Sequence, residues 1–386
     1  MTLLDNLRPE AASAPESGIV AAMNYGRLKP GLIPLWAGEG DETTPDFIRE
    51  AAIEALRAGE TFYTWQRGIP ELREALARYH TRHFGRPFRS EEFLVTASGM
   101  QSIQLALQAV AGAGDEVIYL SPAWPNFAAA AGIAGVKAQP VLLGLVDGCW
   151  RLDLSGVEAA VTPRTRALFV NTPSNPTGWT ASRAELAALL AIARRHGLWI
   201  IADEIYALFH YGEGRAPSFL DVMEDGDRVI FVNSFSKNWA MTGWRVGWIV
   251  AHPSLQQVFE NLIQYSTSGV AQFIQKAAVR ALESGDGFIA AQVAKARANR
   301  DRAVQILSQN PAFEIALPQG AFYLFFRIRG VTDPARDVLR IIDEAGIGLA
   351  PGTAFGPGGE GCFRMCFLRR ADDVSMAAAR LSGWSP

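Results

Sequence analysis

Short runs of apolar residues alternate with helical stretches through the middle of the chain. The runs show no polar alternation, which is typical of strands that are buried on both faces. Between them, apolar residues recur with helical spacing, as over residues 182–196. The pattern predicts a largely parallel sheet covered by helices on both sides. The expected strands cover residues 93–97, 116–120, 166–170, 198–203, 228–234 and 245–250.

The pattern is different at both ends of the chain. Residues 1–35 contain several prolines and predict an irregular arm. After about residue 285, helices and strands have a more polar balance, which predicts a second, smaller α+β unit. The expected organisation is an N-terminal arm (1–44) that joins the small unit, a large domain (45–285) and a small C-terminal domain (286–386). The expected helices outside the sheet region cover residues 45–56, 70–84, 287–307 and 333–345, and the expected strands of the small unit cover 321–328 and 362–368.

The composition limits the classes of function. The chain has 386 residues, of which 49% are hydrophobic and 19% charged, the balance of a globular protein rather than a disordered one. The net charge is −3 without a basic run, which makes nucleic acid or a membrane surface a poor candidate partner. No stretch reaches the roughly 18 apolar residues that span a bilayer, and no signal peptide is apparent.

Cysteines and histidines narrow the choice further. Three cysteines cannot form a disulfide framework, and they fit a reducing compartment such as the cytoplasm. Five scattered histidines suggest no metal site. His80 and His83 are separated by two residues on a polar helix without a Cys or carboxylate partner nearby, and the expected structure there is a solvated helix face.

Polar motifs follow the expected strands, and ligands of open α/β sheets bind at the carboxyl ends of strands. Gly99 and Met100 open a helix after the first strand, where backbone N–H groups can approach an anion, although such turns are also common connectors. Asn175 precedes a proline in a turn-rich segment, so its amide is held as a directional donor unless the segment is a simple connector.

Two further motifs carry ionisable groups. Asp203 ends an apolar strand, where an unpaired carboxylate would be costly, and Tyr206 follows close by. Lys237 follows another apolar strand. It is either a loop lysine on the surface or a partly desolvated nucleophile suited to a Schiff base. Arg245, eight residues later, could bind a phosphate with two donors, and Ser234 precedes the lysine.

Together these motifs describe one ligand. It has a phosphate for the N–H groups and Arg245, a basic ring nitrogen for Asp203, a phenolic oxygen for Asn175 and Tyr206, and an aldehyde for Lys237. These are the groups of pyridoxal 5′-phosphate.

The motifs resemble those of the class I/II aminotransferases of pyridoxal-phosphate fold type I, the aspartate aminotransferase-like family. The resemblance extends over about residues 30–375 and is carried by the segments SFSKNWAMTGWRVG, NPTG and ADEIY. It implies a large domain with a mainly parallel, seven-stranded sheet flanked by helices, and a smaller α+β domain.

The resemblance also implies roles for single residues. Lys237 would form the Schiff base, and Asp203 would pair with the pyridine nitrogen, which makes the ring an electron sink. Asn175 and Tyr206 would bind the ring oxygen, and Trp124 would stack on the ring. The phosphate would be held by Gly99, Met100, Ser234 and Arg245, and by Tyr63 of the neighbouring subunit of a homodimer with shared active sites. Met100 stands where relatives often carry a polar residue.

Four positions bear on the substrate. Arg364 lies between Cys362 and Cys366 on one face of a strand, and a buried arginine needs an anion. The family uses the matching arginine for the substrate α-carboxylate, with a backbone contact from Gly38, and Asn175 faces the same group. Arg67 stands where many relatives have small or proline-rich residues. Arg67 is a candidate for binding a distal carboxylate of the substrate, and a role as a surface residue fits it equally well.

The expected function is a ping-pong aminotransferase that moves an α-amino group to a 2-oxo acid such as 2-oxoglutarate, with aspartate or another dicarboxylic donor favoured. Its partners are small molecules, without nucleic acid or membrane. An aromatic or broad-range aminotransferase and a C–S β-lyase are alternatives, because relatives with these reactions share the same cofactor residues. A non-catalytic effector domain of a transcription regulator is a distant alternative. Such proteins carry a DNA-binding module before this fold, whereas here only about 35 residues without a helix-turn-helix pattern precede it.

Overall fold

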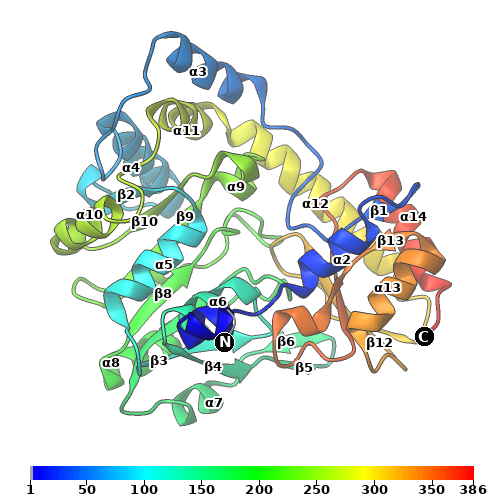
Figure 1. Cartoon of the computed structure of the whole chain (residues 1–386). Coiled ribbons are helices and arrows are strands. Elements are labelled where there is room, and N and C mark those ends of the chain that lie inside the picture. Colours follow the sequence, from blue (N-terminus) through cyan, green and yellow to red (C-terminus); the bar gives the residue numbers. More distant parts are fainter. Residues whose placement is uncertain (1–2) are drawn as a thin grey trace.

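A seven-stranded sheet forms the centre of the larger part of the computed structural model, which describes residues 3–386 (Figure 1). Strand β10 runs antiparallel to both of its neighbours, and the other pairs are parallel. The predicted, mainly parallel sheet is therefore confirmed. In spatial order the strands are β2 (Phe93–Thr96), β10 (Gly247–Val250), β9 (Val229–Ser234), β8 (Trp199–Asp203), β7 (Thr165–Asn171), β3 (Glu116–Ser121) and β4 (Lys137–Leu142).

Both faces of this sheet are buried, as its unbroken apolar strands require. In β8, Ile200 and Ala202 pack into one hydrophobic core and Ile201 into another on the opposite face. One face is covered by α5 (Gly99–Val110), α6 (Pro125–Ile133) and α10 (Gln256–Gln264), and the other by α4 (Pro70–Phe84), α8 (Arg183–His196) and α11 (Gln272–Ser284).

Helix ends follow local sequence signals. Helix α8 begins after a capping box, in which Ser182 Oγ accepts from the Glu185 N–H and the Glu185 carboxylate accepts from the Ser182 N–H. It ends at Gly197, whose φ of +66° is left-handed. Helix α4 starts with Pro70 in its first turn. These signals explain why both helices are found close to the predicted ranges.

A four-stranded antiparallel sheet forms the second part of the structure. Helix α12 (Asp286–Leu307) runs alongside both parts (Figure 1), and β1 (Ile33–Pro34) pairs in parallel with β13 (Ile347–Gly348). The division of the chain after residues 44 and 285 stays a prediction. The sheet contains β11 (Phe313–Ile315), β12 (Tyr323–Ile328), β15 (Cys362–Cys366) and β14 (Ala350–Pro351), with helices α13 (Pro334–Ala345) and α14 (Ala371–Ser382) beside it.

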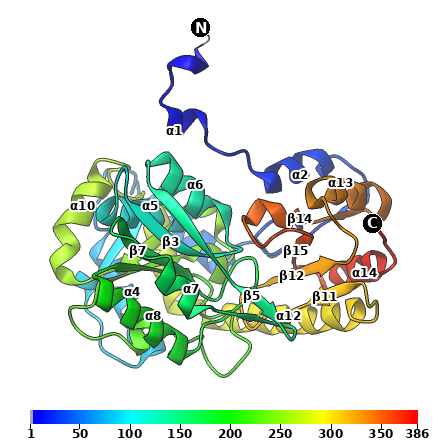
Figure 2. The ribbon, with the colours of Figure 1, turned by 90° about the horizontal axis from the view of Figure 1, so that it is seen from below.

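The N-terminal arm is more regular than predicted. It contains the helices α1 (Pro9–Ala12) and α2 (Gly18–Gly26). Ser17 caps α2, because its side chain accepts a hydrogen bond from the Val20 N–H. The segment before α2 extends outward (Figure 2) but contacts α6, where Arg8 Nη2 donates to the Ile133 carbonyl oxygen at 2.9 Å. The first two residues of the predicted arm lie outside the described residues. Besides short 3-10 turns, the remaining elements are α3 (Asp46–Arg57), β5 (Gly144–Val146), β6 (Cys149–Arg151), α7 (Leu154–Ala159) and α9 (Phe235–Asn238).

The expectation of a solvated face at His80 is wrong. His80 is 2% exposed, and its Nε2 accepts a hydrogen bond from Trp248 Nε1 at 3.0 Å. Burial lowers its pKa to about 3, so the ring is neutral. Helix α4 turns His80 toward the sheet together with the apolar residues Leu76 and Tyr79. An aromatic ring with one satisfied nitrogen packs there like a hydrophobic side chain.

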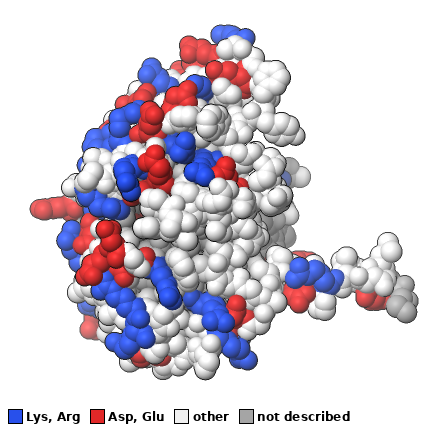
Figure 3. All heavy atoms as spheres, turned by 90° about the vertical axis from the view of Figure 1, so that its left-hand side faces the viewer, with Lys and Arg blue, Asp and Glu red and all other residues white. Residues whose placement is uncertain are grey.

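Charged side chains of both signs are mixed along the left, top and bottom of the face shown in Figure 3, whereas the middle of this face is largely uncharged. Within residues 3–386, no helix combines the length and the apolar character that a membrane crossing demands.

Candidate active site

A cavity of about 370 Å³ opens at the carboxyl ends of the parallel strands, between the two sheets. The strand ends bring to it residues that are far apart in the sequence, as the topology predicts. Two predicted site residues, Tyr63 and Arg67, do not line the cavity of the described chain. The others do: Gly38, Gly99, Met100, Trp124, Asn175, Asp203, Tyr206, Ser234, Lys237, Arg245 and Arg364.

Lys237 lies in α9, directly after β9, and its ammonium group faces the cavity. Its Nζ donates a hydrogen bond to the carbonyl oxygen of Gly38 at 2.6 Å. Burial lowers the pKa of Lys237 to about 8, and the nearby Arg364 and Arg245 act in the same direction. A substantial neutral fraction near pH 8 makes this amine both a nucleophile and a base.

Asp203 ends β8 inside the cavity and is 2% exposed. Burial raises the pKa of its carboxyl group to about 7, while the Ile205 N–H and Lys237 act to lower it. The N–H donor is 3.4 Å from Oδ1, which is a long contact. The buried carboxylate is therefore poised for a cationic donor that enters the cavity.

Tyr206 and Tyr323 form a buried pair beside Lys237. Their hydroxyl oxygens are 2.8 Å apart, and burial raises the pKa of both phenols. A Cβ on Gly38 would stand 2.7 Å from Tyr323 Oη and 3.8 Å from Lys237 Nζ, so glycine lets the backbone approach this group closely. Both phenols are protonated at neutral pH, and because one hydroxyl donates to the other, the pair can donate one hydrogen bond into the cavity.

Arg364 lies in β15 and is 2% exposed. Its Nη1 donates to Asn175 Oδ1 at 3.0 Å and its Nη2 to the carbonyl oxygen of Trp36. The guanidinium carbon is 4.6 Å from the Tyr323 ring centre and 4.9 Å from that of Phe355. Its Nε is buried and has no hydrogen-bond partner among residues 3–386. These contacts are all with neutral groups, which leaves the positive charge for an anion.

A group of donors lies at the other end of the cavity, where α5 begins. The first N–H groups of a helix have no acceptor within it, and those of α5 start at Gly99. A Cβ on Gly99 would stand 3.2 Å from Ser234 Cβ, so the small residue keeps helix and strand close. Arg245 faces the same end, with its Nη1 donating to the Thr242 carbonyl oxygen at 2.8 Å. This arrangement suits a phosphate.

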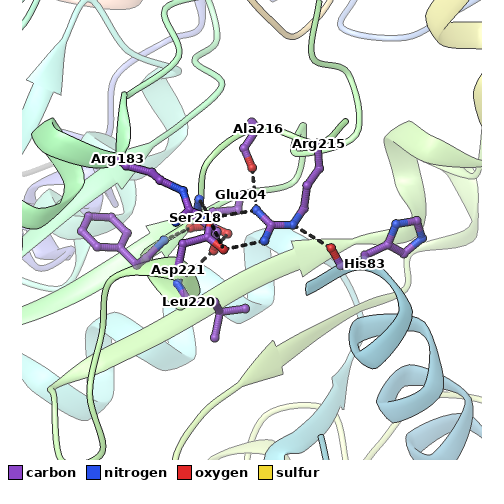
Figure 4. A network of polar contacts seen from close by, with 9 residues as sticks. His83, Arg183, Glu204, Arg215, Ala216, Ser218, Leu220 and Asp221 are labelled. Carbon is purple, nitrogen blue, oxygen red and sulfur yellow. Dashed lines mark hydrogen bonds and ion pairs between the residues drawn. The ribbon is translucent and has the colours of Figure 1, made fainter. Parts of the chain in front are cut away.

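A buried carboxylate also lies directly behind the site. Glu204 follows Asp203 and is 3% exposed. Its Oε2 accepts from Ser218 Oγ at 2.6 Å and its Oε1 from the Phe219 N–H at 3.0 Å (Figure 4). These bonds tie the end of β8 to a loop that returns 14 residues later in the sequence.

Arg215 extends this network to the neighbouring helix. Its guanidinium donates to both carboxylate oxygens of Asp221, at 2.9 and 2.5 Å, and its Nε donates to the His83 carbonyl oxygen at 2.9 Å (Figure 4). The carbonyl belongs to the last turn of α4. The loop after Asp203 is therefore anchored to the helix layer rather than left free.

The Glu204 carboxyl group should make stability depend on pH. Burial raises its pKa from 4.5 to about 7. The folded state therefore keeps a proton that the unfolded state has lost, and this contribution to stability falls as pH rises from about 4.5 through 7. The shift corresponds to about 3 kcal/mol. In Glu204→Gln, the loss of unfolding free energy between pH 5 and pH 8, measured with denaturant, should shrink by most of that amount.

The matched control for this comparison is Glu50→Gln, since Glu50 is exposed in α3. It should leave the pH dependence unchanged. An identical pH dependence in wild type and Glu204→Gln would show that the carboxyl group does not titrate with a raised pKa.

The two remaining predicted residues lie outside the cavity. Tyr63 is 92% exposed. Arg67 is ion-paired with Glu260 of α10, with its Nε 2.6 Å from Oε2. The structure thus places neither of them near the other site residues within one chain.

Sequence reasoning missed Tyr323 and Asn171. Tyr323 was counted only as part of an apolar strand, although its hydroxyl was a signal for a polar role. Asn171 ends β7, its Nδ2 donates to the Asp203 carbonyl oxygen at 3.1 Å, and its Oδ1 accepts from the Asn175 N–H at 2.8 Å. An asparagine at the end of an apolar strand could have been singled out, as Asp203 was.

The chain is similar to proteins of known activity over most of its length. The model of the family described as aminotransferase class I and II matches residues 30–381. An arginine–pyruvate transaminase of Pseudomonas aeruginosa is 35% identical over 353 residues, 91% of this chain and 89% of the relative. An aspartate aminotransferase of Thermotoga maritima is 34% identical over 324 residues, 84% of each chain.

Solved structures give the same result. A crystal structure of aspartate aminotransferase from Thermotoga maritima superposes with a TM-score of 0.90 at 30% identity, over 98% of this chain and 99% of that one. An aromatic aminotransferase of Pyrococcus horikoshii gives a TM-score of 0.86 at 32% identity, over 94% and 98% of the two chains.

Proposed function

Because the chain belongs to the class I and II aminotransferases, which depend on pyridoxal phosphate, we propose that the cavity between the sheets is its active site, where an α-amino group passes from a free amino acid to a 2-oxo acid. The observation that carries the proposal is the position of Lys237, Asp203 and Arg364 around one cavity. They supply a buried amine, a buried carboxyl group and a guanidinium whose contacts are with neutral groups.

The residues of the cavity fit the cofactor. The buried Asp203 carboxyl group suits a protonated ring nitrogen, and the donors at the start of α5, with Ser234 and Arg245, suit the phosphate. Lys237 is the amine that would hold the aldehyde carbon. Trp124 offers a ring to stack against, and Asn175 and Tyr206 offer donors for the ring oxygen. Bound pyridoxal phosphate supplies an aldehyde that captures the amino group and a ring that withdraws electrons from Cα.

The residues of the chain position the substrate and move its proton. The guanidinium of Arg364 can bind the α-carboxylate, and the backbone at Gly38 limits where the carboxylate can lie. This fixes the direction of the Cα–H bond, and positioning of this kind contributes to the rate. Once free, Lys237 Nζ takes the proton from Cα and later returns it, since its lowered pKa leaves it partly neutral.

The preference for a dicarboxylic donor depends on Arg67. In the described chain its guanidinium is paired with Glu260, which satisfies its charge. Relatives carry the names of aspartate, aspartate/prephenate and arginine–pyruvate aminotransferases, so the family accepts several side chains. Aspartate with 2-oxoglutarate stays the donor and acceptor pair that the sequence favours, and aromatic donors stay the alternative.

We propose a homodimer with shared active sites in the cytoplasm. Phe62, Tyr63 and Trp65 form an exposed aromatic segment, 81%, 92% and 64% exposed, of a kind that a second copy would cover. Tyr63 of the second copy would then reach the phosphate end of the cavity.

The three cysteines are free thiols, in accordance with a reducing compartment.

Two-substrate kinetics test the proposed function. An aminotransferase should give parallel lines in double-reciprocal plots of rate against donor at several concentrations of oxo acid, because the first product leaves before the second substrate binds. A new amino acid should form in equal amount to the oxo acid product. Release of ammonia and pyruvate from a cysteine conjugate without any oxo acid would instead indicate the lyase.

A further inference from the structure

The buried pair of Tyr206 and Tyr323 contains a hydroxyl group that the proposed function does not use. Tyr206 follows β8 of the large sheet, and Tyr323 begins β12 of the small sheet. They are 1% and 0% exposed, and both line the cavity. Their hydroxyl oxygens are 2.8 Å apart, and neither has another hydrogen-bond partner among residues 3–386. The proposed function gives a role to Tyr206 alone, which leaves the hydroxyl of Tyr323 without one.

Hydrogen bonds between the two segments hold the pair in place. The Ala321 N–H donates to the Phe209 carbonyl oxygen at 2.8 Å, and the Ala321 carbonyl oxygen accepts from Tyr211 Oη at 2.6 Å. On the side of Gly38, an added Cβ would stand 2.7 Å from Tyr323 Oη, so the backbone there leaves the hydroxyl little room to move. The short distance between the two hydroxyls is therefore set by the fold.

The charges around the pair decide which hydroxyl donates. Each phenol carries one proton, so one of the two oxygens must accept. The Arg364 guanidinium carbon is 4.6 Å from the Tyr323 ring centre, and a cation at this place makes the Tyr323 hydroxyl the better donor. Burial, Tyr323 and Asp203 all raise the pKa of Tyr206, which makes its oxygen the better acceptor. Tyr323 therefore donates to Tyr206, and the proton of Tyr206 is free to point into the cavity.

We propose that Tyr323 is a positioning residue, whose hydroxyl donates to Tyr206 Oη and so directs the single proton of Tyr206 toward the ring oxygen of bound pyridoxal phosphate. The inference rests on the proposed function. Hydrogen bonds in a chain strengthen one another, so Tyr206 becomes a stronger donor. A donor at the ring oxygen favours the anionic form of that oxygen, and it therefore keeps low the pKa at which the bound cofactor gains a proton.

Other ionisable groups face the same place from the elements around it. A change of tyrosine to phenylalanine leaves all of them unchanged, and it also keeps the ring that packs against Arg364. Besides Lys237, these groups are Glu39 after β1, Asp203 at the end of β8, Arg245 after α9, and Arg364 and Cys366 in β15.

Titration of the visible absorption band of the holoenzyme tests the proposal. In Tyr206→Phe, the pKa of the bound cofactor should rise by about one unit, because a hydrogen bond to a charged oxygen is lost. In Tyr323→Phe, it should rise by about 0.3 unit or more, because one hydrogen bond strengthens the next only in part. The double variant should match Tyr206→Phe alone, since Tyr323 acts through Tyr206.

Tyr211→Phe is the matched control. It removes another buried hydroxyl that holds the same segment, at Ala321, but Tyr211 does not line the cavity. The pKa of the cofactor should stay as in the wild type. An unchanged pKa in Tyr323→Phe, an equal rise in Tyr211→Phe, or additive rises in the double variant would overturn the role of Tyr323 and leave the aminotransferase in place. A wild-type protein that binds no pyridoxal phosphate would contradict the proposed function, and this inference with it.

Discussion

Lys237→Ala is expected to lose transamination by about 10⁴-fold or more while the protein still folds and binds pyridoxal phosphate. Under the proposed function, the substitution removes both the amine that would hold the cofactor and the base that would move the Cα proton. The residues proposed for the phosphate, ring nitrogen and ring oxygen are unchanged, so binding should persist. Rates with a saturating donor and acceptor, together with the cofactor content after gel filtration, measure both parts of the expectation.

The variant should not be less stable than the wild type, since burial of this lysine opposes its charged form and lowers its pKa to about 8. Lys237→Arg separates charge from base function. It keeps the positive charge, but a guanidinium stays protonated and cannot accept a proton. It should therefore be as inactive as the alanine variant. Substantial activity in either variant would place the base elsewhere.

Arg364→Leu is expected to lower kcat/KM for amino acids by about 10³-fold, within the range observed when one partner of a buried charge pair is removed. The loss arises because the α-carboxylate no longer meets a guanidinium, and Asn175 Oδ1 and the Trp36 carbonyl oxygen lose their donor. Steady-state kinetics with one donor measure the effect.

Arg364→Lys should recover only part of this loss, since an ammonium cannot reproduce the planar set of donors. A simple alkylamine, which has no carboxylate, distinguishes binding from structural damage. Its slow reaction should change little in Arg364→Leu if the arginine acts through the carboxylate. An equal loss with the amine and with the amino acid would mean that the substitution disrupts the cavity as a whole.

The sequence contained enough to predict much of the lining of the candidate site. Lys237 and Asp203 each follow an apolar strand, where a charged residue is unusual, and parallel strands bring their carboxyl ends to one edge. The apolar strands predicted a mainly parallel sheet, which the fold confirms. The charged residues at the strand ends predicted pyridoxal phosphate, which the family confirms. The antiparallel direction of β10 was not predictable, because strand order and direction depend on long-range pairing.

The surroundings of the charged groups were also beyond local reasoning. Arg364 and Asn175 are 189 positions apart, and no local pattern indicates that they share a hydrogen bond. His80 looked solvated because its neighbours in the sequence are polar, but the buried face of a helix is decided by what packs on it. Helix α2 was hidden by the prolines on either side of it, although the Ser17 cap was a usable signal.

The absorption spectrum of the purified holoenzyme after addition of an amino acid alone is the most direct test of the central claim. We predict that the visible band of the bound cofactor disappears and a near-ultraviolet band of its amino form replaces it, with one equivalent of 2-oxo acid released per site. Addition of a 2-oxo acid should restore the visible band. A visible band that no amino acid changes, or a change without release of oxo acid, would contradict the assignment of this cavity as the site of amino-group transfer.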